Sequence, residues 1–193
     1  MTFKACAGLI ATLGLVHDLP ILLVGAVSLS PDLAPANVIA VALVAGAFRR
    51  MIKALGTLVA GLTLAMLVAL VITAALEAMG VVESGVAAVN DPLTAYVTVL
   101  APITFVVAAV AGVAAMLAFV TDQGTTAVGV AISVTTIPAA AYAGIALAGG
   151  AFSSVMAALV VLAVNVVFLV LAQCLTLGLM RAWRQRKDQW AAL

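Results

Sequence analysis

The chain has 193 residues, of which 67% are hydrophobic and only 8% are charged, and its mean hydropathy is +1.37. A soluble domain carries about 25% charged residues, because its surface must face water. Eight basic and seven acidic side chains cannot cover such a surface. The composition therefore excludes a soluble domain. It predicts an all-α, multi-pass membrane protein embedded in the lipid bilayer. With no basic stripe and interleaved aromatic residues, nucleic acid is not expected as a partner.

Six apolar runs are candidates for membrane-crossing helices, which need roughly 20 residues. They lie near residues 3–16, 20–48, 51–76, 97–120, 124–148 and 153–180. The basic residues gather at Lys4, at 49–53 and at 181–187. Because basic residues favour the cytoplasmic side, six crossings place all of these residues and both termini in the cytoplasm, across a bacterial inner membrane. The acidic connection 77–96 then lies outside.

The chain also matches itself. When residues 5–67 are shifted by 104 positions onto 109–171, 19 of the 63 aligned residues are identical. The less common matches are Gly8 with Gly112, Asp18 with Asp122, Val24-Gly25 with Val128-Gly129, and Gly46-Ala47-Phe48 with Gly150-Ala151-Phe152. A compositional bias toward Ala, Val and Leu is the alternative explanation.

The self-match predicts two three-span repeats, 1–76 and 97–180, joined by the connection 77–96 and followed by a basic tail, 181–193. Because each repeat has an odd number of spans, the second must enter the membrane from the opposite side. Inverted repeats of this kind are common in secondary transporters, whose sites form where matched helices break near the midplane.

The run 20–48 is too long for one straight crossing. At 1.5 Å per residue it would measure about 43 Å, against a hydrocarbon core of about 30 Å. It contains SPDLAP, in which Pro31 and Pro35 each remove a backbone donor. We therefore expect two shorter helices. The run 124–148 contains SVTTIPAA with Pro138, and we expect a second break there at a matched depth.

Polar side chains near these breaks form the candidate solute or ion site. They are Ser28, Ser30, Asp32, Asn37, Ser133, Thr135, Thr136 and Asn165. A central aspartate costs about 2.5–3.5 kcal/mol in a membrane helix, so we expect Asp32 to line a cavity and meet a proton, a cation or a substrate amine. Alternatively, Asp32 caps the helix that follows it. Asn165 and Gln173 are interpreted more simply as hydrogen-bonding groups between helices.

Enzyme classes fit the sequence poorly. The lone His17 lies at the boundary of an apolar run, and no second carboxylate accompanies Asp32 inside one. No phosphate-binding loop or cluster of metal ligands is present in the sequence. We expect no catalytic residue, no metal and no cofactor.

Two blocks of the chain resemble those of a known family. GLIATLGLVHDLPILLVGAVSLSPDLAP is similar to a block of the pattern ATxGL…VGAMxxSPLxxP, and TTAVGVAISVTTIPAAAYAGIALAGGAF to LVGVAIAxxLVPPLAxxGIxLAxGxW. Both are typical of the bacterial and archaeal membrane family called domain of unknown function 389. Asp32 and Ala139 depart from these patterns. The resemblance implies the fold, in a short form without a soluble N-terminal domain, and implies no reaction.

Two functional hypotheses follow. The first is a transporter or channel for a small solute or ion, with its site at the midplane between the broken helices. The second is a non-transporting scaffold or lipid-binding protein, whose helix breaks shape an oligomer interface. A wet, polar cavity would favour the first, and a dry centre packed with Gly and Ala would favour the second. We expect a homo-oligomer, because six short helices shield little polar interior.

Overall fold

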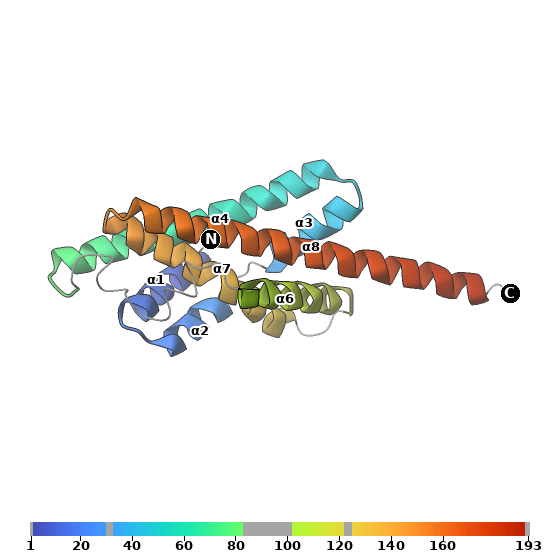
Figure 1. Ribbon diagram of the computed structural model, residues 1–193, viewed down its shortest axis with the longest axis horizontal. Coiled ribbons are helices and arrows are strands. Elements are labelled where there is room, and N and C mark those ends of the chain that lie inside the picture. The colour runs from blue at the N-terminus through green and yellow to red at the C-terminus, as the bar shows by residue number, and fades with distance from the viewer. Residues whose placement is uncertain (1, 30–32, 83–101, 122–124, 192–193) are drawn as a thin grey trace.

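The computed structural model describes residues 2–29, 33–82, 102–121 and 125–191, without the side chains of 29, 33, 102, 125–135 and 184–191. These residues form seven helices and no strand (Figure 1), which confirms the all-α class. The helices are α1 (Thr2–Val16), α2 (Pro20–Leu29), α3 (Leu33–Val44), α4 (Phe48–Ala78), α6 (Pro102–Thr121), α7 (Thr125–Ala148) and α8 (Phe152–Ala191).

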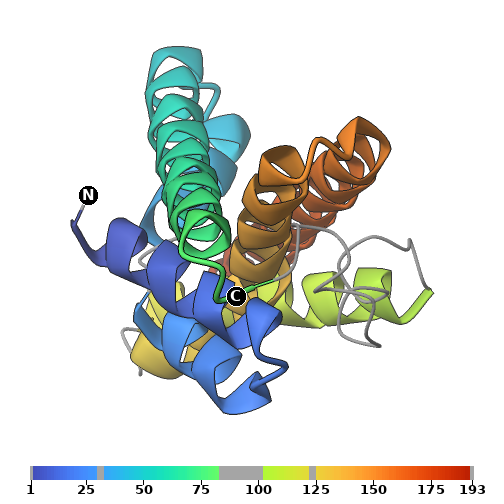
Figure 2. The same ribbon diagram turned by 90° about the vertical axis from the view of Figure 1, so that its left-hand side faces the viewer.

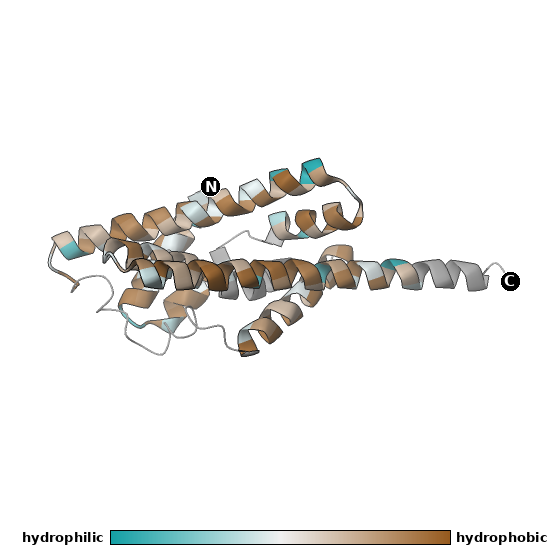
Figure 3. Ribbon diagram, turned by 45° about the horizontal axis from the view of Figure 1, so that its top comes forward, coloured by the Kyte–Doolittle hydropathy of each residue, from teal (hydrophilic) through white to brown (hydrophobic). Residues whose placement is uncertain are grey.

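Three segments of the described chain are long and apolar enough to cross a membrane. They are Phe48–Ala78, Ile103–Thr121 and Phe152–Trp183. At 31 residues, α4 is about 46 Å long, which exceeds the hydrocarbon thickness of about 30 Å. Figure 3 shows apolar residues along most of α4 and α8, with hydrophilic residues at the start of α4 and in the C-terminal half of α8. The chain is therefore a membrane protein.

α7 is the central helix, because it contacts each of the other described helices. On either side of it, α4 and α8 run in opposite directions: α4 ends at the left of Figure 1, where α8 begins, and α8 projects past the other helices on the right. Figure 2 shows α4 and α8 diverging from each other, with α1 and α2 crossing below them. The two long helices thus form the sides of the molecule.

Four helices end in the same backbone motif. A left-handed residue follows each: Asp18 (φ 49°), Gly46 (φ 68°), Gly80 (φ 68°) and Gly150 (φ 69°). The residue after Gly46 donates its N–H to Ala42 O at 2.8 Å, and the residue after Gly150 donates to Ala146 O at 2.9 Å. These are Schellman caps, in which glycine adopts a positive φ at little cost. Gly46 and Gly150 are aligned in the repeat. The backbone therefore makes the same turn before α4 as before α8.

The closest contacts within each half also follow the repeat. A Cβ added to Gly8 of α1 would lie 2.9 Å from Ala65 O of α4, and a Cβ added to Gly112 of α6 would lie 2.6 Å from Leu169 O of α8. Gly8 aligns with Gly112 and Ala65 with Leu169 at the same shift of 104. Therefore α1 packs on α4 as α6 packs on α8.

The contacts between the halves are reciprocal. A Cβ added to Gly144 of α7 would lie 2.7 Å from Ala69 Cβ and 3.0 Å from Leu70 N, both in α4. Ala40 of α3, which aligns with Gly144, contacts α8, where Cys174 Sγ lies 3.7 Å from Ala40 O. Cys174 aligns with Leu70. The middle helix of each half therefore packs on the last helix of the other half at matched positions.

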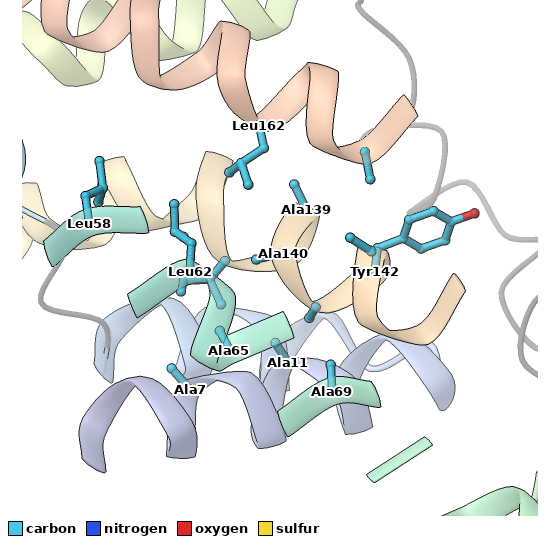
Figure 4. Close-up of a cluster of buried hydrophobic side chains, with 14 of the residues drawn as sticks. Ala7, Ala11, Leu58, Leu62, Ala65, Ala69, Ala139, Ala140, Tyr142 and Leu162 are labelled. Atoms are coloured by element: carbon cyan, nitrogen blue, oxygen red, sulfur yellow. The ribbon is translucent and has the colours of Figure 1, made fainter. Parts of the chain in front are cut away.

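Alanine fills the centre of the molecule. Figure 4 shows Ala7 and Ala11 of α1, Ala65 and Ala69 of α4, and Ala139 and Ala140 of α7 facing one another. Each of these side chains is at most 1% exposed. In a bilayer, helices gain little from leaving lipid, so association depends on close packing of small side chains and on hydrogen bonds between helices. The described centre is accordingly packed closely with small apolar side chains.

The proline positions correct part of the sequence prediction. The run 20–48 is divided into α2 and α3 as expected, and Pro31 lies outside the described residues. Pro35, however, lies in the first turn of α3, where a backbone N–H has no partner within the helix. Pro138 lies inside α7, which is unbroken. The predicted break of the fifth span is therefore wrong: membrane helices accommodate an interior proline when neighbouring groups satisfy the freed carbonyl.

The helical segments also extend beyond their predicted ends. α8 continues through the predicted basic tail to Ala191. Only residues 192 and 193 of that tail lie outside the described chain. The separation of residues 181–193 from the last span is therefore a change of composition within one helix rather than a change of secondary structure.

We predict that Gly8→Ala and Gly112→Ala each lower the free energy of unfolding in detergent by about 1–3 kcal/mol, because the added methyl group meets a backbone carbonyl of the neighbouring helix. Gly56→Ala is the matched control, since a Cβ at Gly56 of α4 meets nothing within 4 Å. Its effect should be neutral or slightly stabilising. Thermal melting followed by circular dichroism checks this, and equal effects of all three changes would contradict the packing argument.

Candidate functional site

A buried pair of amides joins α3 to α8. Gln173 Nε2 donates a hydrogen bond to Asn37 Oδ1 at 2.8 Å, and the two side chains are 0% and 1% exposed. Asn37 lies in the second turn of α3, shortly after the segment that separates α3 from α2. Asn37 is a predicted site residue and Gln173 a predicted interhelical group. The structure brings these two together and makes them the best-defined polar site in the described chain.

The amide pair retains binding capacity. Gln173 Oε1 is buried and accepts no hydrogen bond from the residues that the structure describes. One turn further along, Ala40, Met116 and Leu177 form an apolar cluster contributed by α3, α6 and α8. Amides donate and accept hydrogen bonds but do not titrate near neutral pH. The site is therefore suited to binding a polar group in an apolar setting, and not to acid–base chemistry.

The amide pair breaks the similarity of the two halves. In the repeat alignment, Asn37 corresponds to Ala141 and Gln173 to Ala69. Both alanines are completely buried. The contact of α3 with α8 therefore contains a polar pair, whereas the corresponding contact of α7 with α4 has alanines at the aligned positions.

Seven further polar side chains are buried in the described chain, and three of them bear on the sequence predictions. Thr136 and Asn165, both predicted site residues, are each 2% exposed, and Lys4 is 5% exposed. The side chain of Lys4 contacts Gly61, near the middle of α4. We placed Lys4 at the cytoplasmic surface from the charge pattern; the structure places it between α1 and α4, because Gly61 has no side chain to occupy that space. Gly61 aligns with Asn165, so each half has one buried polar side chain at this level.

The other predicted site residues are not brought together by the described structure. Ser28 is exposed, and its hydroxyl donates to Val24 O of the same helix at 2.8 Å. Ser30 and Asp32 lie outside the described residues, and Ser133 and Thr135 lie in α7 with their side chains outside the description. A site formed around Asp32 remains a prediction. The described residues contain no group of three His, Cys, Asp or Glu side chains that could hold a metal.

A groove of about 500 Å³ lies between α4 and α8, with α7 below it. Its lining residues are Leu55, Leu58, Val59, Leu62, Thr63 and Met66 of α4, Ala140 of α7, and Leu159, Leu162, Ala163, Val166 and Val167 of α8. Thr63 is the only polar residue among these twelve. The groove therefore offers almost nothing to a polar solute.

The groove was not anticipated from the sequence, although a signal was present. Five of its α4 residues align with its five α8 residues at the shift of 104. Two of these aligned pairs are identical, Leu55 with Leu159 and Leu58 with Leu162. The lining positions recur at helical spacing in both runs. In the sequence alone, these apolar positions cannot be distinguished from residues that face lipid. The structure distinguishes them, because α4 and α8 diverge and leave a groove between them.

The family described as "Domain of unknown function (DUF389)" matches residues 28–171. The chain belongs to this family. The match extends from the end of α2 into α8 and includes Asn37 and all twelve residues that line the groove. It confirms the resemblance found in the sequence. Curated proteins and solved structures give no match. The DUF389 description names no activity, so function must be argued from geometry.

We predict that Asn37→Ala and Gln173→Ala each destabilise the protein by about 0.6–2 kcal/mol, because each leaves one buried amide without its partner. The loss of unfolding free energy in the double variant should be smaller than the sum of the two single losses. Two alanines are already accommodated at the aligned positions of the other half. A double-mutant cycle of unfolding free energies in detergent measures the difference. Strict additivity would show that the two amides do not stabilise each other.

Proposed function

We propose that this DUF389 protein transports a small solute or ion, using two inverted three-helix repeats that move relative to each other. The observation that carries the proposal is the reciprocity of the contacts between the halves. Gly144 lies against Leu70, and the aligned pair Ala40 and Cys174 is in contact as well. In a two-fold arrangement, if a residue of the first half contacts a residue of the second, the two aligned residues are in contact as well. These contacts follow that pattern.

The direction of the helices supports inversion. The third helices of the two halves, α4 and α8, run in opposite directions, and the corners at Gly46 and Gly150 lie at opposite ends of the molecule (Figure 1). If these long helices cross the membrane, the two-fold axis lies in its plane. We propose six crossings on this basis, with α2 and α3 counted together as one interrupted crossing.

The charges support the proposed orientation. Arg49, Arg50 and Lys53 at the start of α4 and Arg181 in α8 are exposed. The start of α4 and the C-terminal half of α8 lie toward the same end of the molecule (Figure 3). Basic residues collect on the cytoplasmic side of bacterial membrane proteins. We therefore propose that this end, with the C-terminus, is cytoplasmic.

The proposed solute site lies where α2 and α3 are interrupted. Asp32 and Ser30 belong to that segment, and the Asn37–Gln173 pair connects the first turns of α3 to the other half. In transporters with inverted repeats, substrates and coupling ions bind where a discontinuous helix exposes its backbone and helix ends. Because α7 is unbroken, the proposal now assigns this role to the first half alone.

A second function, a non-transporting scaffold or lipid-binding protein, is favoured by a different observation. The described centre is packed with buried alanines, and the groove is almost entirely apolar. A tightly packed centre can hold halves together without any motion. In this alternative, the interrupted helix would serve an oligomer interface instead of a solute site.

We predict that single cysteines at the two matched corners react from opposite sides of the membrane. Phe48→Cys and Phe152→Cys are suitable because both phenylalanines are exposed, 63% and 69%, and begin α4 and α8. Cys6→Ala and Cys174→Ala remove the native thiols. A membrane-impermeant maleimide applied to oriented vesicles should label one variant before permeabilisation and the other only after it. Labelling of both from one side would refute inversion.

We predict that Asp32→Asn abolishes proton or cation flux in reconstituted liposomes that contain a pH- or cation-sensitive dye, because the neutral amide cannot accept a proton or balance a cation. Asp18→Asn is the matched control: Asp18 is exposed and forms the turn after α1 at φ 49°, a conformation that asparagine adopts readily. Unchanged flux in Asp32→Asn would remove Asp32 from the mechanism. Absence of flux from the unmodified protein would favour the scaffold.

A further inference from the structure

We propose that the groove between α4 and α8 binds one acyl chain of an anionic phospholipid, with the phosphate beside the basic start of α4. This inference concerns a different surface from the solute site and does not depend on transport. The groove opens to the outside of the molecule, since Leu55, Val59 and Val167 along its sides are 42%, 52% and 53% exposed. An open apolar groove at membrane depth must be occupied by hydrocarbon, because an empty one forfeits its packing contacts.

The lining selects a flexible aliphatic chain. It consists of leucine, valine, methionine and alanine side chains, with Thr63 as the one hydroxyl and no aromatic ring. A volume of about 500 Å³ lies within the usual range of small-molecule sites, roughly 300–1,000 Å³. Apart from the Thr63 hydroxyl, the lining residues offer no side-chain group that could satisfy the polar groups of a hydrophilic solute. A saturated or monounsaturated chain has no such groups.

The size of the groove argues against a helix from a second copy of the chain. From Leu55 to Met66 of α4 the groove is about 16 Å long, at 1.5 Å per residue. A helix of that length and about 10 Å in diameter occupies about 1,300 Å³, so a neighbouring helix would enter the groove mainly through individual side chains. One acyl chain fits the space.

The charges next to the groove indicate the headgroup. Lys53 precedes Leu55 by two residues, and Arg49 and Arg50 lie one turn earlier, all three exposed. The described residues of α4 carry no acidic side chain until Glu77, at the far end of the helix. Basic side chains at a membrane surface attract anionic lipids. A phospholipid with its phosphate at this end would direct its chain along the groove toward the middle of α4.

The proposal is tested by native mass spectrometry of the full chain released from nanodiscs made of equal amounts of phosphatidylglycerol and phosphatidylcholine. We expect the unmodified protein to retain one phosphatidylglycerol. Val59→Trp places a large side chain in the groove and should reduce the retained phosphatidylglycerol by about tenfold. This corresponds to about 1.4 kcal/mol of binding free energy. Val71→Trp adds the same ring to the same helix at a 63% exposed valine outside the groove and should retain lipid normally.

The headgroup is tested separately. Lys53→Gln should keep one bound phospholipid but lower the preference for phosphatidylglycerol by about fivefold, the contribution of one basic residue near a membrane surface. Folding of each variant is checked by its thermal melting profile. Equal lipid retention by Val59→Trp and Val71→Trp would overturn the proposal. So would a change in the oligomeric state of Val59→Trp without a loss of lipid, because a second copy would then occupy the groove.

Discussion

The contact between the first and third helices of each half is the constraint on which the rest of the structure depends. In a bilayer, two apolar helices gain nothing from contact unless their backbones approach closely. Gly8 and Gly112 permit this approach, because a methyl group at either position would meet a carbonyl of α4 or α8. With that distance fixed, buried alanines fill much of the remaining space, and α7 packs there with small side chains and with larger ones such as Ile137 and Ile145.

The two halves resemble each other in packing and differ in polarity. The cap at Gly46 recurs at Gly150, and the helix contacts recur at a constant shift along the chain. The buried amide pair does not recur, because Asn37 and Gln173 stand where the aligned positions carry buried alanines. The matched packing contacts are therefore common to both halves, and the polar contact between α3 and α8 belongs to one side of the molecule.

The sequence predicted the all-α class and the membrane setting, because composition and the length of apolar runs are local properties of the chain. The matched Gly46-Ala47-Phe48 and Gly150-Ala151-Phe152 stand where α4 and α8 begin, whereas the sequence placed these spans at 51–76 and 153–180. The predicted helix breaks at Pro35 and Pro138 were wrong, because the effect of a proline depends on its position in the helix. Pro35 lies in the first turn of α3, and Pro138 lies inside α7, which packs against the other helices. The bond between Asn37 and Gln173 joins residues 136 positions apart. No periodicity in either helix specifies that pairing.

The unbroken α7 gives the two halves different mechanical properties. Because α7 contacts every other described helix, a displacement of either half is transmitted to it. The run from Pro20 to Val44 is divided into α2 and α3, whereas α7 is continuous. Under the proposed transport mechanism, movement of one half against the other would act on the amide pair, which joins α3 to α8. It would also change the width of the groove, which is lined by one long helix from each half, so a lipid chain held there would favour the arrangement that fits it.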